Sequence, residues 1–128
     1  MIILDHNIPE DQAGQLRRWR IHLRQIGFEV GRPEWDDQQQ ILRYLHATRQ
    51  ATFLTRDQGF YRRRLCHSNY CLVVLTVPVL ETARCIRRLL RHPMFRTIAS
   101  RQGKVLKVST DKIAYWQVGE QRHLIVGW

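Results

Sequence analysis

Residues 71–77 have the sequence CLVVLTV, a continuous apolar and β-branched run that ends at Pro78. Such a run is typical of a strand buried on both faces, and strands of this kind belong to parallel sheets covered by helices. Pro78 has no backbone N–H to donate, so the strand cannot continue through it. The chain is therefore expected to build its core around a central strand at residues 71–77.

Other strands and helices alternate on both sides of this central run. Apolar strands are predicted at residues 1–4, 28–30 and 52–55. Helices are predicted at residues 10–26, 37–50 and 79–91, with a short helix through residues 60–65. Segments 104–110 and 113–118 alternate like the strands of a hairpin around Asp111 and Lys112, and residues 123–128 are a candidate for a further strand.

This order of elements predicts an α/β fold with a mostly parallel central sheet, helices on both faces and a C-terminal β-hairpin. A length of 128 residues is that of one domain, so residues 1–128 are expected to form a single domain. No apolar stretch approaches the roughly 18 residues that span a bilayer, and the N-terminus becomes polar too early for a secretory signal. A cytoplasmic location without a membrane partner is therefore expected.

Two aspartates, Asp5 and Asp57, each come directly after a predicted strand. Neighbouring parallel strands bring such residues to one edge of the sheet, where the functional sites of open α/β folds lie. A third acidic group, Asp36 and Asp37, stands at the start of a predicted helix and caps it or adds a carboxylate. Taken singly, an aspartate in these places is an ordinary turn or cap residue.

Together, these acids favour a metal site. Clustered carboxylates repel one another unless a cation neutralises them, and hard oxygen ligands suit Mg²⁺ or Mn²⁺. Such an ion generates a hydroxide from bound water and stabilises charge on a phosphodiester, so hydrolysis of that bond is the expected chemistry. A zinc site at Cys66, His67 and Cys71 is the competing metal hypothesis, but no second cluster completes four ligands.

The formal net charge is +10 and the pI is near 10.6, which makes the chain attractive to polyanions. Nucleic acid is the leading partner class, and an acidic protein is the alternative. Arg62, Arg63 and Arg64 follow Asp57 and are candidates to bind the flanking phosphates, although each is also a normal solvated surface residue. The arginines of residues 84–91 are the candidate docking face for an acidic protein.

Two segments resemble a widespread prokaryotic group of small PIN-like proteins related to the VapC toxin ribonucleases. Residues 3–9 (ILDHNIP) are similar to the opening motif LLDENLP of that group, and residues 53–60 (FLTRDQGF) resemble its LVTRDKDF segment. Asp37, with ILRY at residues 41–44, is similar to its SDEEILEYA helix start. The late apolar strand, the basic helix and the closing hairpin follow in the order of the group.

The resemblance implies a three-layer α/β/α PIN-like sandwich and a Mg²⁺- or Mn²⁺-dependent ribonuclease. Asp5, Asp37 and Asp57 match the catalytic, metal-binding acids. Members of the group are commonly toxins of toxin-antitoxin modules, so RNA, an antitoxin protein and a second copy of the chain are the implied partners. These three partners would bind in the cytoplasm, which is the location expected for this chain.

The chain departs from the pattern of the group in three places. His6 replaces an acid, Gly59 stands where a second aspartate is usual, and Asp37 is one residue out of register, so Asp36 competes with it for the third ligand. The alternative function is a non-catalytic PIN-like protein that binds nucleic acid or regulates through a degenerate metal site.

Three side chains near the strand-end acids are candidates for supporting roles. His6 is a proton shuttle, a phosphate contact or a simple surface histidine. Asn7 orients a metal-bound water or caps the following helix. Thr55 positions the site through its hydroxyl, or is an ordinary strand threonine.

Overall fold

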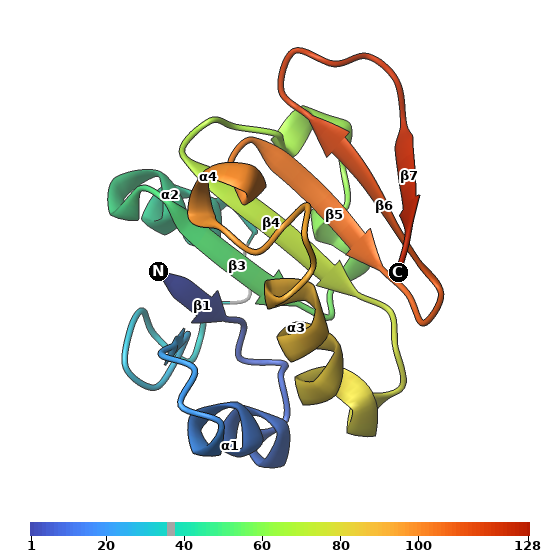
Figure 1. The fold of residues 1–128 in the computed structure, drawn as a ribbon. Helices are drawn as coiled ribbons and strands as arrows, with labels where there is room; N and C mark the ends of the chain where they lie inside the picture. Colours follow the sequence, from blue (N-terminus) through green and yellow to red (C-terminus); the bar gives the residue numbers. More distant parts are fainter. Residues whose placement is uncertain (36–37) are drawn as a thin grey trace.

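The computed structural model describes residues 1–35 and 38–128, which form a mixed α/β fold around one seven-stranded sheet (Figure 1). The strands are β1 (Ile2–Leu4), β2 (Arg24–Gln25), β3 (Ala51–Thr55), β4 (Tyr70–Leu75), β5 (Lys104–Val108), β6 (Lys112–Gln117) and β7 (Leu124–Gly127). The α-helices are α1 (Glu10–Arg18), α2 (Gln38–Thr48), α3 (Thr82–Leu90) and α4 (Ile98–Arg101). Three short 3₁₀ helices are η1 (Gln58–Phe60), η2 (Arg63–Leu65) and η3 (Val79–Glu81).

The sheet has the strand order β2-β1-β3-β4-β5-β6-β7. The pairs from β2 to β5 are parallel, and the pairs β5-β6 and β6-β7 are antiparallel. The expected mostly parallel sheet and C-terminal hairpin are therefore confirmed. Most of the long apolar run forms β4 at the centre of the sheet, where every residue of the strand is buried, although β4 ends at Leu75, before the predicted end at residue 77.

Alternation along the strands divides the core into two clusters. In β3, Leu54 packs in one cluster with residues of α1 and α3, while the adjacent Phe53 packs in the other with residues of α2. Successive side chains of a strand point to opposite faces of the sheet, so the two clusters lie on its two faces. On the first face, α1 and α3 lie side by side (Figure 1).

The predicted helix over residues 10–26 is wrong in its second half, because α1 ends at Arg18. Arg20 has a φ of +63°, a left-handed conformation that stops the helix, and Ile21 N then donates to Leu16 O. Trp19, Ile21 and Leu23 still pack against the first cluster from an irregular segment. Leu16, Trp19, Leu23 and Ile26 have the spacing of a helical stripe, but only Leu16 lies in α1.

The predicted strand at residues 28–30 is also wrong. The strand beside β1 is β2, which pairs Gln25 with Leu4, and Ile26 N donates to Leu4 O. Gly27 has a φ of +88° and opens a turn in which its N–H donates to Val30 O. Phe28 lies in this turn with 68% of its surface exposed, so its apolar character does not mark a buried strand.

The remaining helices differ less from the prediction. The predicted helix at residues 79–91 begins with η3 before becoming α3, and the short helix after Asp57 is two separate 3₁₀ turns, η1 and η2. Helix α4 was not predicted from the sequence. None of the helices in the described part of the chain has the length and apolar character needed to cross a bilayer.

Candidate functional site

Asp5 and Asp57 lie at the same edge of the sheet, because β1 and β3 are parallel neighbours. Leu4 pairs with Leu54, and Asp5 N donates to Leu54 O at 2.8 Å. Asp5 is 2% exposed, whereas Asp57 is exposed on the turn that follows β3. The edge therefore combines a buried carboxylate with one that solvent reaches.

The hydroxyl of Thr55 joins the two aspartates. Thr55 Oγ1 donates to Asp5 Oδ2 at 2.6 Å and accepts from Asp57 N at 3.0 Å. It also accepts from Asn7 Nδ2 at 3.3 Å. A hydroxyl has one proton to donate and two lone pairs, so these three bonds use its full capacity. Thr55 therefore connects the side chain of Asp5 to the backbone of Asp57.

Asn7 connects the loop after β1 to the loop after β3. Its Oδ1 accepts from Arg56 N at 3.2 Å, while its Nδ2 reaches Thr55. The N-cap of α1 is Pro9, which makes no side-chain capping bond. The capping interpretation of Asn7 is therefore wrong, and the side chain instead holds two loops at the correct separation.

His6 lies directly against the buried carboxylate. Its backbone N–H donates to Asp5 Oδ1 at 2.8 Å, and its Nδ1 lies 2.8 Å from the same oxygen. The imidazole is 38% exposed. The imidazole therefore lies between the buried carboxylate and the surface. His6 thus links Asp5 to solvent.

Asp57 caps the turn that begins after it. Its Oδ1 accepts from Gly59 N at 2.8 Å, at the N-terminus of η1. A Cβ at position 59 would lie 3.0 Å from Asp57 Oδ1, so a larger residue there requires the carboxylate to shift by a few tenths of an ångström. The glycine that departs from the motif of the resembling group is therefore matched to the conformation of Asp57 in this chain.

The third acidic candidates, Asp36 and Asp37, lie outside the described residues. The next residue, Gln38, is the first of α2, and its Nε2 donates to Gly59 O at 2.8 Å. The start of α2 therefore lies beside the turn that carries Asp57. Across residues 1–35 and 38–128, no three His, Cys, Asp or Glu side chains are grouped closely enough to hold a metal ion together.

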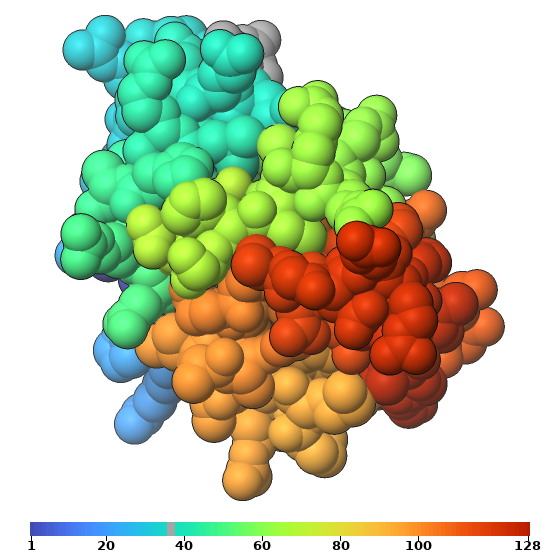
Figure 2. Space-filling view, turned by 90° about the horizontal axis from the view of Figure 1, so that it is seen from above, coloured from blue at the N-terminus to red at the C-terminus, as the bar shows by residue number. Residues whose placement is uncertain are grey.

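Arg62, Arg63 and Arg64 are exposed, as a phosphate contact requires, but their segment packs toward the C-terminal strands. The Arg63 guanidinium lies 5.8 Å from the centre of the Trp116 ring. The neighbouring Tyr61 hydroxyl lies 2.5 Å from His123 Nε2, and Figure 2 shows this green-yellow segment against the red C-terminal one. Within the described residues, none of the three arginines forms a hydrogen bond or ion pair with Asp5 or Asp57.

Two residues that support this edge were missed from the sequence. Gln25 is 3% exposed, and its Nε2 donates to the carbonyls of Asp5 and Ile8, which fixes the loop after β1. Arg56 Nη1 donates to Thr82 Oγ1 at 3.1 Å, which ties the loop after β3 to the start of α3. Nothing in the sequence indicated that Gln25 supports this edge, because the residue lies within the helix predicted at residues 10–26.

The competing zinc hypothesis is not supported by the cysteines. Cys71 is fully buried in β4, and burial raises the pKa of its thiol to about 12. Zinc binds the thiolate form, which this environment disfavours. His67 Nδ1 accepts a hydrogen bond from Asn69 N at 3.0 Å, so that nitrogen already has a partner.

Comparisons with protein-family models, curated proteins and solved structures give no match to this chain. Function is therefore inferred from the chemistry of the sheet edge. That edge brings together the carboxylates of Asp5 and Asp57, the imidazole of His6 and the polar side chains of Asn7 and Thr55.

Proposed function

We propose that the protein is a metal-dependent ribonuclease with a PIN-like, three-layer α/β/α fold. The observation that carries the proposal is the hydroxyl of Thr55, which binds Asp5 and the backbone of Asp57 and so places both acids at one sheet edge. The packing of α1 and α3 with one core cluster and of α2 with the other supports the layered arrangement. The motifs at residues 3–9 and 53–60 support the family.

The residues at this edge fit a hard divalent cation. A carboxylate offers about four acceptor positions, and Asp5 uses two of them in hydrogen bonds from Thr55 Oγ1 and His6 N. Mg²⁺ typically takes one or two protein carboxylates and completes its shell with waters and substrate phosphates. Asp5 and Asp57 would hold Mg²⁺ or Mn²⁺, with Asp37 or Asp36 as the proposed third ligand. The ion would supply an activated water and offset phosphate charge.

The other side chains have distinct proposed roles. Thr55 and Asn7 hold the loops after β1 and β3 together, and thereby the two acids. His6 accepts or returns a proton at Nε2 while Asp5 fixes its ring through Nδ1. Arg62, Arg63 and Arg64 contact RNA phosphates away from the acids. An antitoxin protein and a second copy of the chain are the proposed protein partners of such a nuclease.

The test is cleavage of fluorophore-quencher RNA substrates, single-stranded and hairpin, by the purified chain with Mg²⁺, Mn²⁺ or EDTA. Cleavage should require the metal, and Asp5→Asn or Asp57→Asn should lower the rate by at least about 100-fold, since outer-shell changes alone cost 10- to 100-fold. Asp111→Asn is the matched control, because Asp111 is exposed at the β5-β6 turn. Thermal unfolding should show that all three variants are folded.

Cleavage that survives EDTA and both active-edge substitutions would overturn the proposal. One observation favours the alternative of a non-catalytic nucleic-acid-binding protein: Asp5 already accepts two protein hydrogen bonds, and its Oδ1 also lies 2.8 Å from His6 Nδ1. A degenerate site of this kind predicts RNA binding that falls with salt, does not respond to EDTA and leads to no turnover.

A further inference from the structure

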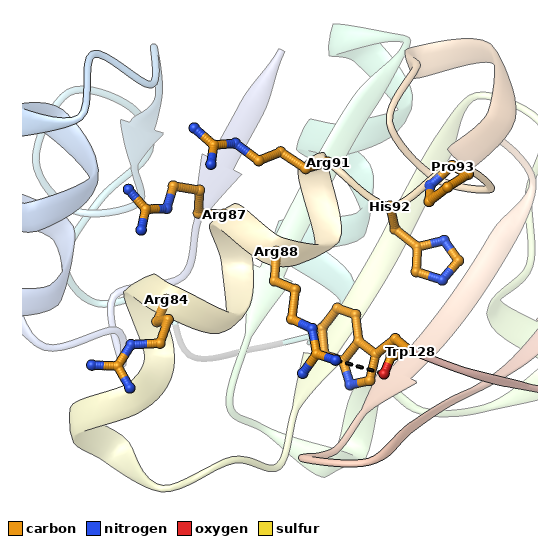
Figure 3. Close-up of a pocket in the computed structure, with 7 residues that line it drawn as sticks. All are labelled: Arg84, Arg87, Arg88, Arg91, His92, Pro93 and Trp128. Atoms are coloured by element: carbon orange, nitrogen blue, oxygen red, sulfur yellow. Dashed lines mark hydrogen bonds between the residues drawn. The ribbon is translucent and has the colours of Figure 1, made fainter.

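Helix α3 and its C-cap residue carry four arginines, Arg84, Arg87, Arg88 and Arg91, which we call the arginine face. Together with His92, Pro93 and Trp128 they line a pocket of about 500 Å³ (Figure 3). Arg84 and Arg91 are seven residues apart, so the face is about 10 Å long at the rise of an α-helix. This length exceeds what a single phosphate or carboxylate needs.

The arginine face carries an excess of positive charge, although Arg88 Nη2 donates to Trp128 O and Glu81 lines a pocket together with Arg84. Within residues 1–35 and 38–128, none of its four guanidinium groups forms an ion pair with a carboxylate. Arg84, Arg88 and Arg91 are exposed, and Arg87 is half-buried. Four like charges on one short helix repel one another, so an anionic ligand that spans them would be bound favourably.

Two tryptophans hold part of this face in place. The Arg87 guanidinium lies 3.6 Å from the centre of the Trp19 ring, and that of Arg88 lies 4.3 Å from the centre of the Trp128 ring. Arg88 Nη2 also donates to Trp128 O at 2.6 Å, the dashed line in Figure 3. A stacked guanidinium keeps N–H groups at its edge for a ligand, and its orientation is already set before binding.

The arginine face begins at the candidate functional site. Thr82, the first residue of α3, accepts a hydrogen bond from Arg56, which directly precedes Asp57 in the chain. Gln12 of α1 accepts from Ala83 N at 2.9 Å, so α1, which follows the Asp5 loop, is fixed to the same end of α3. A nucleic-acid strand bound at Asp5 and Asp57 can therefore continue along α3.

We propose that the arginine face binds the backbone phosphates of single-stranded RNA, and that the pocket beside Trp128 receives a base. This inference rests on the proposed function, for which it names a second contact region of the RNA. Basic side chains combined with aromatic rings are the usual means by which proteins hold single strands without reading their sequence. An acidic protein segment would need the arginines but not a pocket with an indole wall.

The test measures the binding of a labelled 12-nucleotide RNA by fluorescence anisotropy in EDTA, where metal-dependent cleavage cannot occur. The variant Arg84→Gln/Arg91→Gln removes two exposed charges, while the guanidinium groups of Arg87 and Arg88 that stack on the two tryptophans are kept. It should weaken binding about tenfold and reduce the slope of log K against log salt by about 1.4, since each phosphate contact to a single strand contributes about 0.7. The control Arg24→Gln/Arg43→Gln removes two exposed charges elsewhere and should leave the slope unchanged.

The variant Trp128→Leu tests the base-binding pocket. It should weaken binding of the RNA about tenfold, as loss of one stacked base does, and leave binding of inorganic polyphosphate unchanged. If Arg24→Gln/Arg43→Gln and Arg84→Gln/Arg91→Gln lose equal RNA affinity, the proposal is overturned, because binding then depends on overall charge and not on a site. Tighter binding of an oligoglutamate peptide than of RNA would also overturn it, in favour of a protein-docking face.

Because binding is measured without metal, its outcome is separate from that of the proposed activity. If the Arg84→Gln/Arg91→Gln variant binds RNA more weakly but the protein never cleaves RNA, the proposed ribonuclease activity is refuted and the proposed binding surface is retained. If the protein cleaves RNA with metal but the Arg84→Gln/Arg91→Gln variant binds RNA as well as the unchanged protein does, the proposed binding surface is refuted and the proposed ribonuclease activity is retained.

Discussion

Asp5 and Arg101 are the two charged side chains that lie buried in the described part of the chain, and each is held by a threonine of β3. Thr55 Oγ1 donates to Asp5 Oδ2 at 2.6 Å, at the carboxyl end of the strand. Arg101 Nε donates to Thr52 Oγ1 at 2.9 Å, near its amino end. The same residue type on the same strand thus binds a buried acid and a buried base.

The surroundings of the two charges differ. Arg101 Nη1 donates to Phe95 O at 2.8 Å, and Phe95 and Thr52 are themselves fully buried. Burial lowers the pKa of Arg101 from its ordinary value. Asp5, in contrast, contacts His6, which is 38% exposed, and is joined to the exposed Asp57 through Thr55. A buried charge therefore marks a functional candidate only where its partners reach solvent, and Arg101 is expected to be structural.

The largest expected effect is on stability, from Arg101→Ala. The substitution leaves Thr52 and the Phe95 carbonyl without their donor and opens a cavity, so the free energy of unfolding should fall by about 4 kcal/mol. Urea denaturation measures this change. Arg101→Met is the control: it fills the space without burying a charge and should lose much less. An equal loss in both variants would show that the charge itself stabilises the fold.

Thr55→Val should have the next largest effect and, unlike the change at Arg101, should act on function. It removes the donor to Asp5 and the acceptor for Asp57 N and Asn7, and should lower the free energy of unfolding by about 3 kcal/mol. RNA cleavage by the fraction that remains folded should also fall, because the two acids lose their common support. Thr55→Ser keeps the hydroxyl and should restore most of both. Full activity in the valine variant would contradict the positioning role.

Thr52→Val makes the same chemical change three positions earlier on β3 and should have the smallest effect. Only the bond from Arg101 Nε is lost among those described for this hydroxyl, so the free energy of unfolding should fall by about 1.5 kcal/mol. RNA cleavage per folded molecule should not change. A loss of cleavage equal to that of Thr55→Val would remove the distinction between the two ends of the strand.

The sequence predicted those residues of the candidate site that lie directly after a β-strand. Asp5 and Asp57 were identified because each follows a short strand, and parallel pairing of β1 with β3 places such residues together. Gln25 was not predictable, since it belongs to β2, a strand of two residues that lay inside an apparent helical stripe. Of the two interpretations of Asn7, helix capping was wrong, because its side chain bonds Thr55 and Arg56 instead.

The sequence by itself determined the elements whose signal is local. The unbroken apolar run of β4 and the alternation of β5 and β6 reflect which side chains must leave water, and they require no distant partner to be identified. The order of these elements also determined a mostly parallel α/β sheet with an antiparallel end.

Only the tertiary structure decided which polar groups meet. Thr55 and Asp5 are 50 residues apart and Arg101 and Thr52 are 49 apart, and no spacing in the chain encodes either pair. The end of α1 at Arg18 was likewise set by packing, since Trp19, Ile21 and Leu23 reach the core from an irregular segment. Hydrogen bonds and packing depend on distance in space, and for these residues that distance is created only when the sheet assembles.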